Sequence, residues 1–339
     1  MKKLHSLPTE DVLLQCLAND IIDRNEDILR FCSILDSLHE CTAIAIDGAW
    51  GSGKTFFVKH TKMIIDSYCF NNMLTPLVQD GIKRAKSANS TTFDNFSITQ
   101  MHSTVYYDAW ENDDDSDPIL SIINALIKTN QVSSRIQNER EPIEVLKKLA
   151  DCLTGRSIAA LCDAIQGHDF LEDIKKHESI NELMSKFLDD AIGRDNNRLI
   201  VFIDELDRCK PTFAVSLLER IKHFFTDNRF TFVFSINHDQ LQHTIKSYYG
   251  NGINASKYLE KLFDVSIPLP EANVKRFVNK LGVNNKTYYY DKVYFEVIRY
   301  FDFKLRDISK LLQYLKLTTF DLAHDRGKFS KSSLDNTRS

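Results

Sequence analysis

A glycine-rich segment early in the chain constrains the fold more than any other feature. Residues 41–47, CTAIAID, form a short apolar run, and Gly48–Thr55, GAWGSGKT, follow it directly. These eight residues match G-x-x-x-x-G-K-[ST], in which glycines let backbone N–H groups curl around phosphate oxygens at the start of a helix. A chance match is the alternative, but the strand-like run before the motif and the helical pattern after it are the context that the motif requires. We therefore predict a strand, a phosphate loop and a helix.

The residue types in this loop predict its ligands. In such loops the Lys54 ammonium reaches the β- and γ-phosphates, and the Thr55 hydroxyl binds Mg²⁺. The chain has no guanine-specific N-K-x-D element, which favours ATP over GTP. The expected cofactors are therefore ATP and Mg²⁺. The motif predicts that the nucleotide-binding residues are Gly48, Ala49, Trp50, Gly51, Ser52, Gly53, Lys54, Thr55 and Phe56.

A second apolar run ends in two carboxylates. In residues 199–205, LIVFIDE, Asp204 and Glu205 stand at the carboxyl end of a predicted buried strand, where ligands bind in parallel sheets. We predict that Asp204 holds Mg²⁺ and that Glu205 is the catalytic base that polarises the attacking water. A helix N-cap is the alternative role for such an acidic pair. Because a base in this position suits hydrolysis better than transfer to a small acceptor, we expect an ATPase rather than a kinase.

Strands and helices alternate over the rest of the core. Strand character recurs at residues 103–110, 199–204, 230–236 and 265–269, with helical patterns between the runs. Asp117 and Pro118 predict the start of one of these helices, as an N-cap and a first-turn proline. This alternation predicts an α/β fold with a parallel sheet flanked by helices.

The helical and polar stretches predict the domain organisation. Residues 9–40 show helical spacing of apolar residues, and only helical patterns follow residue 271. Residues 80–100 are polar without periodicity, so we expect a surface loop or an insertion there. The predicted regions are an N-terminal helical segment at 1–40, a nucleotide-binding core at 41–270 with insertions at about 70–100 and 130–195, a C-terminal helical lid at 271–325 and a flexible tail at 326–339.

Four segments, in this order and spacing, resemble the KAP family of P-loop NTPases. They are IDGAWGSGKTFF (46–57), YYDAWEND (106–113), FIDELDRCKPTFAVSLLERIKHFF (202–225), and FVFSINHDQL (232–241) followed by YLEKLFDVSIPLP (258–270). The resemblance implies a P-loop ATPase core of the type with an additional sheet strand and a catalytic glutamate, and a C-terminal helical lid. Many members carry membrane-spanning helices within this domain, whereas the insertions here are polar or amphipathic, so no membrane-spanning segment is expected.

The resemblance also assigns graded roles to single residues. It places Asp108 and Trp110 near the nucleotide or the attacking water, with packing of Trp110 under the loop as the alternative. Asn237 stands where related ATPases have a polar sensor of the γ-phosphate. Asp239 is expected either to be the acidic residue that family members often have near this sensor or to cap the next helix. Arg306 stands where a lid arginine touches the γ-phosphate, with simple solvation as its alternative.

Three further cations are weaker candidates for charge contacts. Arg208 is assigned either to a contact within or between subunits or to a salt bridge with a neighbouring acid. Lys257 and Lys261 are candidates for a cation supplied in trans, although exposed helix lysines are usually solvated. The expected partners are nucleotide and either a second copy of the chain or another protein that binds the lid or the insertions.

Composition and charge weigh against several other classes of protein. The net charge of -4 and the lack of a Lys/Arg-rich stripe argue against a nucleic-acid motor, which remains the first alternative function. An interaction module that binds nucleotide without turnover is the second. Seven scattered cysteines without a C-x-x-C pair, and no apolar run of membrane-spanning length, predict a cytoplasmic protein without a zinc site. The leading hypothesis is an Mg²⁺-dependent ATPase that acts as a regulatory switch, and the resemblance suggests a role in bacterial anti-phage defence.

Overall fold

The computed structural model describes most of the predicted core and lid. The described residues are 8–69, 74–115, 117–128, 185, 186, 189, 198–225, 227–280 and 295–314. The predicted tail at 326–339 lies outside them, as does the predicted insertion at 130–195 apart from residues 185, 186 and 189.

A five-stranded parallel sheet forms the centre of the molecule. The strands are β1 (Thr42–Asp47), β2 (His102–Asp108), β3 (Arg198–Asp204), β4 (Phe230–Ile236) and β5 (Val265–Pro268), in the order β2-β3-β4-β1-β5. Strand β4 is inserted between the strand of the glycine-rich loop and the strand that ends in the carboxylates, and it pairs with both. All pairs are parallel, so all five carboxyl ends lie along one edge. The predicted α/β fold with its additional strand is confirmed.

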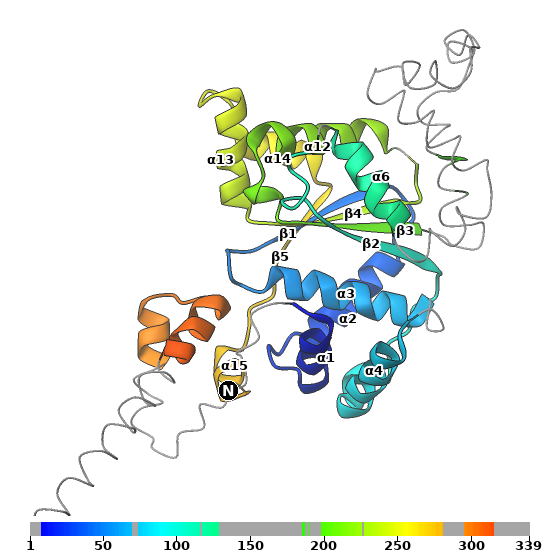
Figure 1. Ribbon diagram of the computed structural model, residues 1–339, viewed down its shortest axis with the longest axis vertical. Coiled ribbons are helices and arrows are strands. Elements are labelled where there is room, and N and C mark those ends of the chain that lie inside the picture. Colours follow the sequence, from blue (N-terminus) through cyan, green and yellow to red (C-terminus); the bar gives the residue numbers. More distant parts are fainter. Residues whose placement is uncertain are drawn as a thin grey trace, which may run out of the picture.

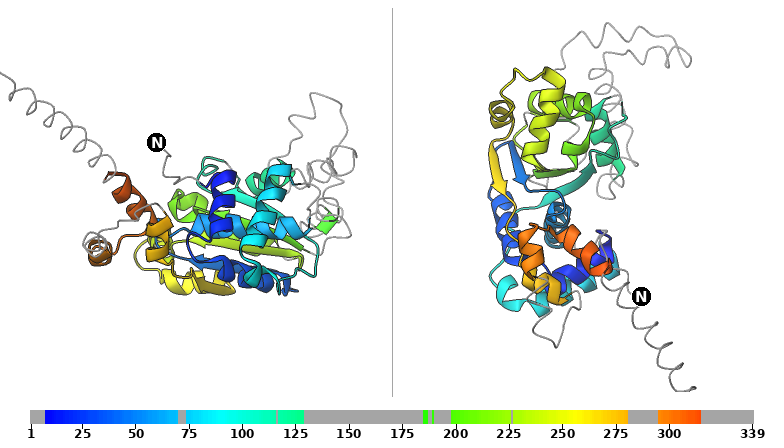
Figure 2. Two further views of the ribbon diagram at one scale, coloured as in Figure 1. Left: turned by 90° about the horizontal axis from the view of Figure 1, so that it is seen from below. Right: turned by 90° about the vertical axis from the view of Figure 1, so that its left-hand side faces the viewer.

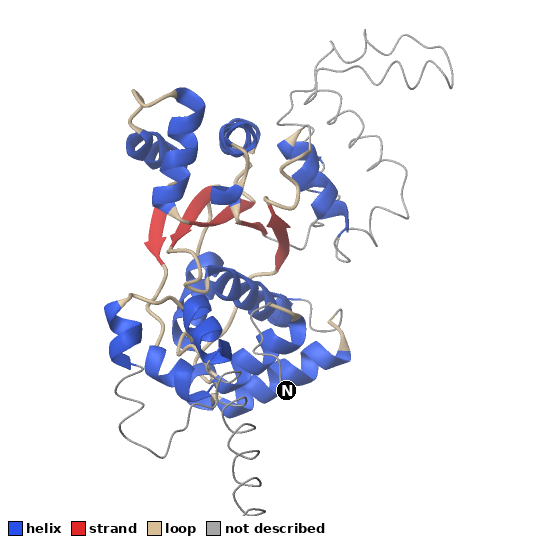
Figure 3. Cartoon of the chain, turned by 60° about the vertical axis from the view of Figure 1, so that its left-hand side comes forward, coloured by secondary structure: helices blue, strands red, loops and turns tan. Residues whose placement is uncertain are grey.

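Helices cover both faces of this sheet, as Figures 1 and 3 show. The helices of the upper layer in Figure 1 are α6 (Pro118–Lys128), α12 (Pro211–Phe224), α13 (His238–Tyr249) and α14 (Ala255–Leu262). They pack on alternate residues of β4, Phe230, Phe232 and Phe234, which are almost fully buried. Helix α6 begins as predicted, because the Asp117 carboxylate accepts hydrogen bonds from the Ile119 and Leu120 N–H groups at 2.9 and 3.2 Å.

The lower layer contains α1 (Glu10–Asn19), α2 (Asn25–Asp36) and α3 (Lys54–Cys69). Helices α2 and α3 bury their apolar sides against Ile44, Phe202 and Val233, which project from the opposite face of the sheet. The helices predicted over residues 9–40 are therefore confirmed, and they cover one face of the core.

The surface loop predicted over residues 80–100 is wrong for residues 80–93, whereas residues 94–100 carry no helix or strand. The segment instead folds into α4 (Pro76–Ala88) and α5 (Ser90–Phe93). Val78, Ile82 and Ala85 of α4 are buried, and their spacing places them on one helix face. Gly81 lets α4 approach α1 closely, since a Cβ at Gly81 would lie 2.7 Å from the Leu14 side chain. Three small or medium apolar residues among many polar ones gave too weak a periodicity to detect.

The C-terminal part of the described chain is helical. It contains α15 (Val274–Lys280) and helical residues 295–300 and 305–314, which lie beside α15 in Figure 2. Phe277, Ile308 and Leu312 form a small apolar cluster with Ile22, which precedes α2, and with Phe56 of α3. This cluster, separate from the cores on the two sheet faces, attaches these C-terminal helices to the start of α3, the helix that follows the glycine-rich loop.

Candidate functional site

The glycine-rich loop between β1 and α3 has the backbone that its sequence predicts. Gly51 and Gly53 have φ values of 78° and 97°, which side chains other than glycine rarely adopt. Helix α3 begins at Lys54, and the Phe57 N–H donates to the Gly53 carbonyl at 3.1 Å in its first turn. The unpaired N–H groups of this helix start therefore face the loop, as anion binding requires.

Lys54 is buried within the loop. Its Nζ donates to the carbonyl oxygens of Gly48 at 2.6 Å and Ala49 at 3.4 Å. Burial lowers the pKa of the Lys54 ammonium, and the negative charges of Asp207, Asp204 and other acids oppose that shift. The ammonium is thus held at the centre of the loop by neutral carbonyls, which a phosphate can replace as its partner.

The carboxyl end of β3 places Asp204 on the same sheet edge as the glycine-rich loop, with β4 between β3 and the loop strand β1. Its side chain is only 1% exposed, and Asp204 lies in register with Ser235 of β4 and Asp108 of β2. One carboxylate oxygen accepts from the Glu205 N–H at 3.0 Å, and the other accepts from the Tyr106 hydroxyl at 3.0 Å. These contacts fix the orientation of a carboxylate on the sheet face covered by α3.

Asp108 ends β2 on the same edge. Its carboxylate accepts from the N–H groups of Trp110 and Glu111, both at 3.1 Å, so it closes the turn after the strand. Burial raises the pKa of Asp108, and the charges of Glu111 and Asp204 raise it further. The structure therefore places Asp108 beside Asp204, with its side chain engaged in local turn contacts, and its predicted role near the nucleotide or the attacking water stays a prediction.

Glu205 has an unusual backbone conformation. Its φ is 60°, in the left-handed region that costs a glutamate of order 1 kcal/mol or more and is often found at functional sites. Its carboxylate pairs with Arg208 at 2.6 Å, so one of the two roles expected for Arg208, a salt bridge to a neighbouring acid, is observed. Burial raises the pKa of Glu205 to about 7, and the adjacent Asp204 acts in the same direction, whereas Arg208 opposes it. This poise near neutrality is typical of a general base.

Sequence patterns did not reveal three residues that also line this edge. Asp207 is buried and accepts a hydrogen bond from the indole N–H of Trp50 in the glycine-rich loop. The Tyr106 hydroxyl donates to the Asp204 carboxylate. Ser235 lies in register with Asp204, and its hydroxyl is buried. The period-2 side-chain alternation of β2 and β4 was the available signal, since Tyr106, Asp108 and Ser235 project toward α3.

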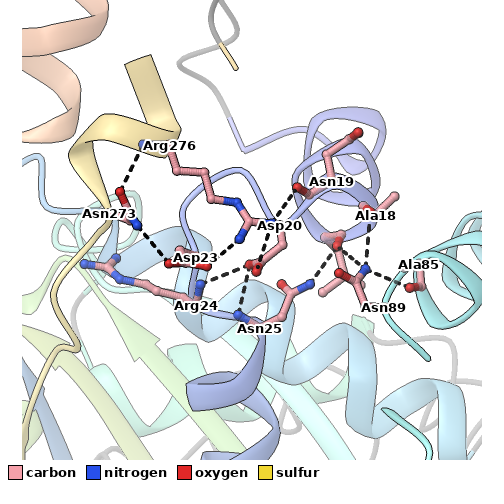
Figure 4. Close-up of polar contacts among 11 residues, drawn as sticks. Ala18, Asn19, Asp20, Asp23, Arg24, Asn25, Ala85, Asn89, Asn273 and Arg276 are labelled. Carbon is pink, nitrogen blue, oxygen red and sulfur yellow. Dashed lines mark hydrogen bonds and ion pairs between the residues drawn. The ribbon is translucent and has the colours of Figure 1, made fainter. Parts of the chain in front are cut away.

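Arg24 is a fourth residue that the sequence did not indicate. It precedes α2, is 5% exposed and donates from Nη1 to the Ser52 carbonyl at 2.9 Å. Burial lowers the pKa of its guanidinium to about 10. Figure 4 shows that the surrounding turn is fixed by Asp20, which accepts from the N–H groups of Arg24 and Asn25 at 3.0 and 3.1 Å. A segment distant in sequence thus supports the glycine-rich loop.

The other predicted residues lie at different distances from the loop. Asn237 caps α13, since its side chain accepts from the Gln240 N–H at 3.2 Å, so the alternative cap at Asp239 is wrong. The Arg306 N–H donates to the Gly51 carbonyl at 3.2 Å, while its side chain is exposed. Lys257 and Lys261 are exposed on α14, in the layer across the sheet from α3.

Trp110 is 52% exposed, so the alternative that it packs under the loop is wrong. Its ring faces the Arg208 guanidinium, with 5.4 Å between the guanidinium carbon and the ring centroid. The Trp110 side chain therefore contributes to the rim of the site rather than to its core.

Buried polar atoms without partners test whether phosphate and Mg²⁺ fit this edge. Among the described residues, five buried side-chain atoms have no hydrogen-bond partner, and four of them belong to Arg24, Ser52, Asp207 and Ser235. Such atoms are rare in folded proteins, and a ligand, an ion or a water molecule commonly provides the missing hydrogen-bond partner. Their concentration around the loop, together with carboxylate and hydroxyl oxygens of the kind that Mg²⁺ prefers, fits a bound phosphate and its metal ion.

A phosphate loop on β1 and an acidic strand end on β3, separated by β4, define the chain as a P-loop nucleotide-binding protein. Residues 24–319 match the KAP family P-loop domain, and the chain belongs to the KAP family of P-loop NTPases. No helix among the described residues combines the length and the apolar character that crossing a membrane demands.

Two further similarities are partial. An uncharacterised protein of Methanocaldococcus jannaschii is 39% identical over 57 residues, which are 16% of this chain and 29% of that protein. A solved structure of the Aeropyrum pernix ORC2 protein (ADPNP-ADP complexes) has 13% identity and a TM-score of 0.34, over 82% of this chain and 52% of that chain. The chain thus spans about a third to a half of these two proteins.

Proposed function

We propose that this chain binds ATP with Mg²⁺ and hydrolyses it. The observation that carries the proposal is the meeting of Lys54, Asp204 and Glu205 at one sheet edge, from segments about 150 residues apart in the sequence. The orphaned polar atoms of Ser52, Asp207 and Ser235 support it, because a nucleotide with its metal and waters would supply their missing partners.

Each residue has a distinct chemical task in this proposal. The loop N–H groups and the Lys54 ammonium bind the phosphates and offset their negative charge. Glu205 accepts a proton from the water that attacks the terminal phosphate, and Asp204 and Thr55 are the residues that would hold Mg²⁺. When bound, that ion would neutralise charge on the phosphate oxygens. Asp108, Asn237 and Arg306 remain candidates for contacts around the same phosphates.

We further propose that ATP acts on the position of the lid, which would make the protein a regulatory switch. Support comes from direct contacts between the lid and the loop. The Arg306 N–H donates to Gly51, and a Cβ at Gly51 would lie 3.0 Å from the Cβ of Arg306. A Cβ at Gly53 would lie 3.3 Å from the Leu305 side chain. A nucleotide that enters this narrow space would have to displace residues 304–306, because protein interiors do not compress.

The test compares wild type with Lys54→Ala and Glu205→Gln. We expect Mg²⁺-dependent ATP hydrolysis by wild type, loss of nucleotide binding in Lys54→Ala, and retained binding with trapped ATP in Glu205→Gln. Hydrodynamic size with and without ATP and Mg²⁺ reports movement of the lid and any self-association of the chain. The proposal fails if wild type shows neither binding nor turnover above the Lys54→Ala control.

The resemblance's suggestion of anti-phage defence extends this proposal to biology. Its test is the efficiency of phage plating on bacteria that express wild type or Lys54→Ala at equal levels. Protection that requires Lys54 would support the role, and equal plating on both strains would remove it without affecting the proposed ATPase activity.

A further inference from the structure

Both tryptophans of the chain lie at the rim of the candidate site. The 339-residue sequence contains only two, Trp50 in the glycine-rich loop and Trp110 after β2. Their side chains are 46% and 52% exposed, although tryptophan is a large apolar residue that usually packs inward. Core packing therefore does not explain either position.

The guanidinium of Arg208 lies close to both rings. Its central carbon is 5.9 Å from the Trp50 ring centroid and 5.4 Å from that of Trp110, within the range of cation–π attraction. Trp50 is itself fixed, because its indole N–H donates to Asp207, the residue before Arg208. Two separate loops thus hold one cation in a defined place.

Arg208 in turn contacts Glu205. Its Nε lies 2.6 Å from the Glu205 Oε2, and its backbone N–H donates to the Glu205 carbonyl at 3.1 Å. Among the described residues nothing donates to the other carboxylate oxygen of Glu205. One oxygen is therefore anchored, and the other is left to accept a proton.

We propose that Arg208 is a positioning residue that orients the Glu205 carboxylate toward the attacking water, and that Trp50 and Trp110 fix Arg208 for this task. The role rests on the proposed ATPase function. A glutamate side chain has three rotatable bonds, and a carboxylate that samples several rotamers is seldom within reach of a water at the terminal phosphate. Holding it in one place removes that loss, as catalytic geometry demands.

The pairing also depends on the chemistry of arginine. A planar guanidinium stacks on aromatic rings and donates from Nε at the same time, whereas a lysine ammonium offers one compact charge. Arg208→Gln removes both contacts, and Arg208→Lys retains only a charge that can reach the carboxylate. Arg84→Gln is a matched control, because Arg84 makes a similar local ion pair with Asp80 on the exposed side of α4.

Steady-state kinetics and tryptophan fluorescence test the proposal. We expect Arg208→Gln to lower kcat roughly 10- to 100-fold with KM and ATP affinity changed less than about twofold, because the residue acts on Glu205 and not on the nucleotide. Arg208→Lys should recover part of the loss. In a Glu205→Gln background, Arg208→Gln should have no further effect on kcat.

Fluorescence gives a readout independent of turnover. Since Trp50 and Trp110 are the only tryptophans, Arg208→Gln should change the intrinsic emission of the protein without nucleotide, and Arg84→Gln should not. Unchanged emission, unchanged kcat, or an additive loss in the Glu205→Gln background would overturn the role. Lack of turnover in wild type would remove the ATPase proposal and this role with it, whereas normal turnover by Arg208→Gln would remove only the role.

Discussion

The two sides of the phosphate loop are built in different ways. Toward β2 and β3, the loop faces side chains with charge: Asp204, Glu205 and Asp207, with Arg208 beside them. Toward the N-terminal segment and the lid, it is contacted through its own carbonyl oxygens, by Arg24 at Ser52 and by the Arg306 N–H at Gly51. The first side carries groups that can do chemistry, and the second carries groups that hold the shape of the loop.

This difference predicts separate effects of mutation on the two sides. Changes at the acidic side should alter the rate of the chemical step and leave binding intact. Changes at the N-terminal side should alter nucleotide affinity or stability and leave the rate at saturating ATP close to normal. Kinetics that separate kcat from affinity therefore test whether the two sides are functionally distinct.

Glu205→Gln should have the largest effect. Removal of a general base costs roughly 10²- to 10³-fold in kcat, and the amide is nearly isosteric, so ATP affinity should stay within about threefold of wild type. Single-turnover hydrolysis and equilibrium binding of a fluorescent ATP analogue measure the two quantities. A parallel loss of ATP affinity would show that the acidic side also binds the nucleotide, so the two sides of the loop would not be functionally distinct.

His60 makes the stability of the second side depend on pH. This α3 residue is fully buried, its Nε2 lies 2.8 Å from the Leu13 carbonyl of α1, and burial lowers its pKa to about 4. The unfolded chain, with a histidine pKa near 6.5, binds the proton more readily. The stabilisation that neutral, buried His60 gives to the folded protein is therefore fully present above about pH 6.5. As pH falls toward 4 this stabilisation is lost, and the free energy of unfolding decreases by up to about 3 kcal/mol.

Urea denaturation of wild type and His60→Gln between pH 7 and 4.5 measures this contribution. The glutamine variant can still donate to Leu13 but cannot titrate, so its stability should fall less steeply with acid. Equal slopes for the two proteins would show that His60 is not responsible. His39, an exposed histidine outside the helices, provides the control variant His39→Gln.

The same contrast explains which parts the sequence could predict. The phosphate loop and the Asp204–Glu205 pair follow apolar strands within a few residues, so local pattern and parallel topology placed them correctly. Arg24 could not be found, because its contact with Ser52 spans 28 residues and depends on the packing of α2 against α3. Helix α4 was missed for a related reason. Its small apolar face packs against α1, and local periodicity does not reveal a contact between segments so far apart in the sequence.

Arg24→Met should have an intermediate effect. The change leaves the partly buried Ser52 carbonyl without its donor and loosens the loop, so we expect ATP affinity to fall about 10-fold, with kcat at saturation within about threefold of wild type. Isothermal titration calorimetry and steady-state kinetics check both. Arg30→Met on the exposed side of α2 is the control. A fall in kcat that matches that of Glu205→Gln would mean that Arg24 reaches the reacting phosphate and belongs with the acidic side.

Arg276→Gln should have the smallest effect. Arg276 links α15 of the lid to the turn before α2, with ion pairs to Asp23 at 2.6 Å and Asp20 at 3.4 Å, as Figure 4 shows. The pairs are partly exposed to water and salt, so their loss should lower the free energy of unfolding by no more than about 1 kcal/mol.

Asn273 also joins α15 to this turn, by donating to Asp23 at 3.0 Å and through its N–H to the Ile22 carbonyl at 3.2 Å. ATP affinity should therefore change less than about threefold, and the difference from wild type should shrink in 0.5 M salt, to about half or less of its low-salt value. A loss as large as that of Arg24→Met, persistent in salt, would show that the lid controls the loop through this turn rather than through residues 305 and 306.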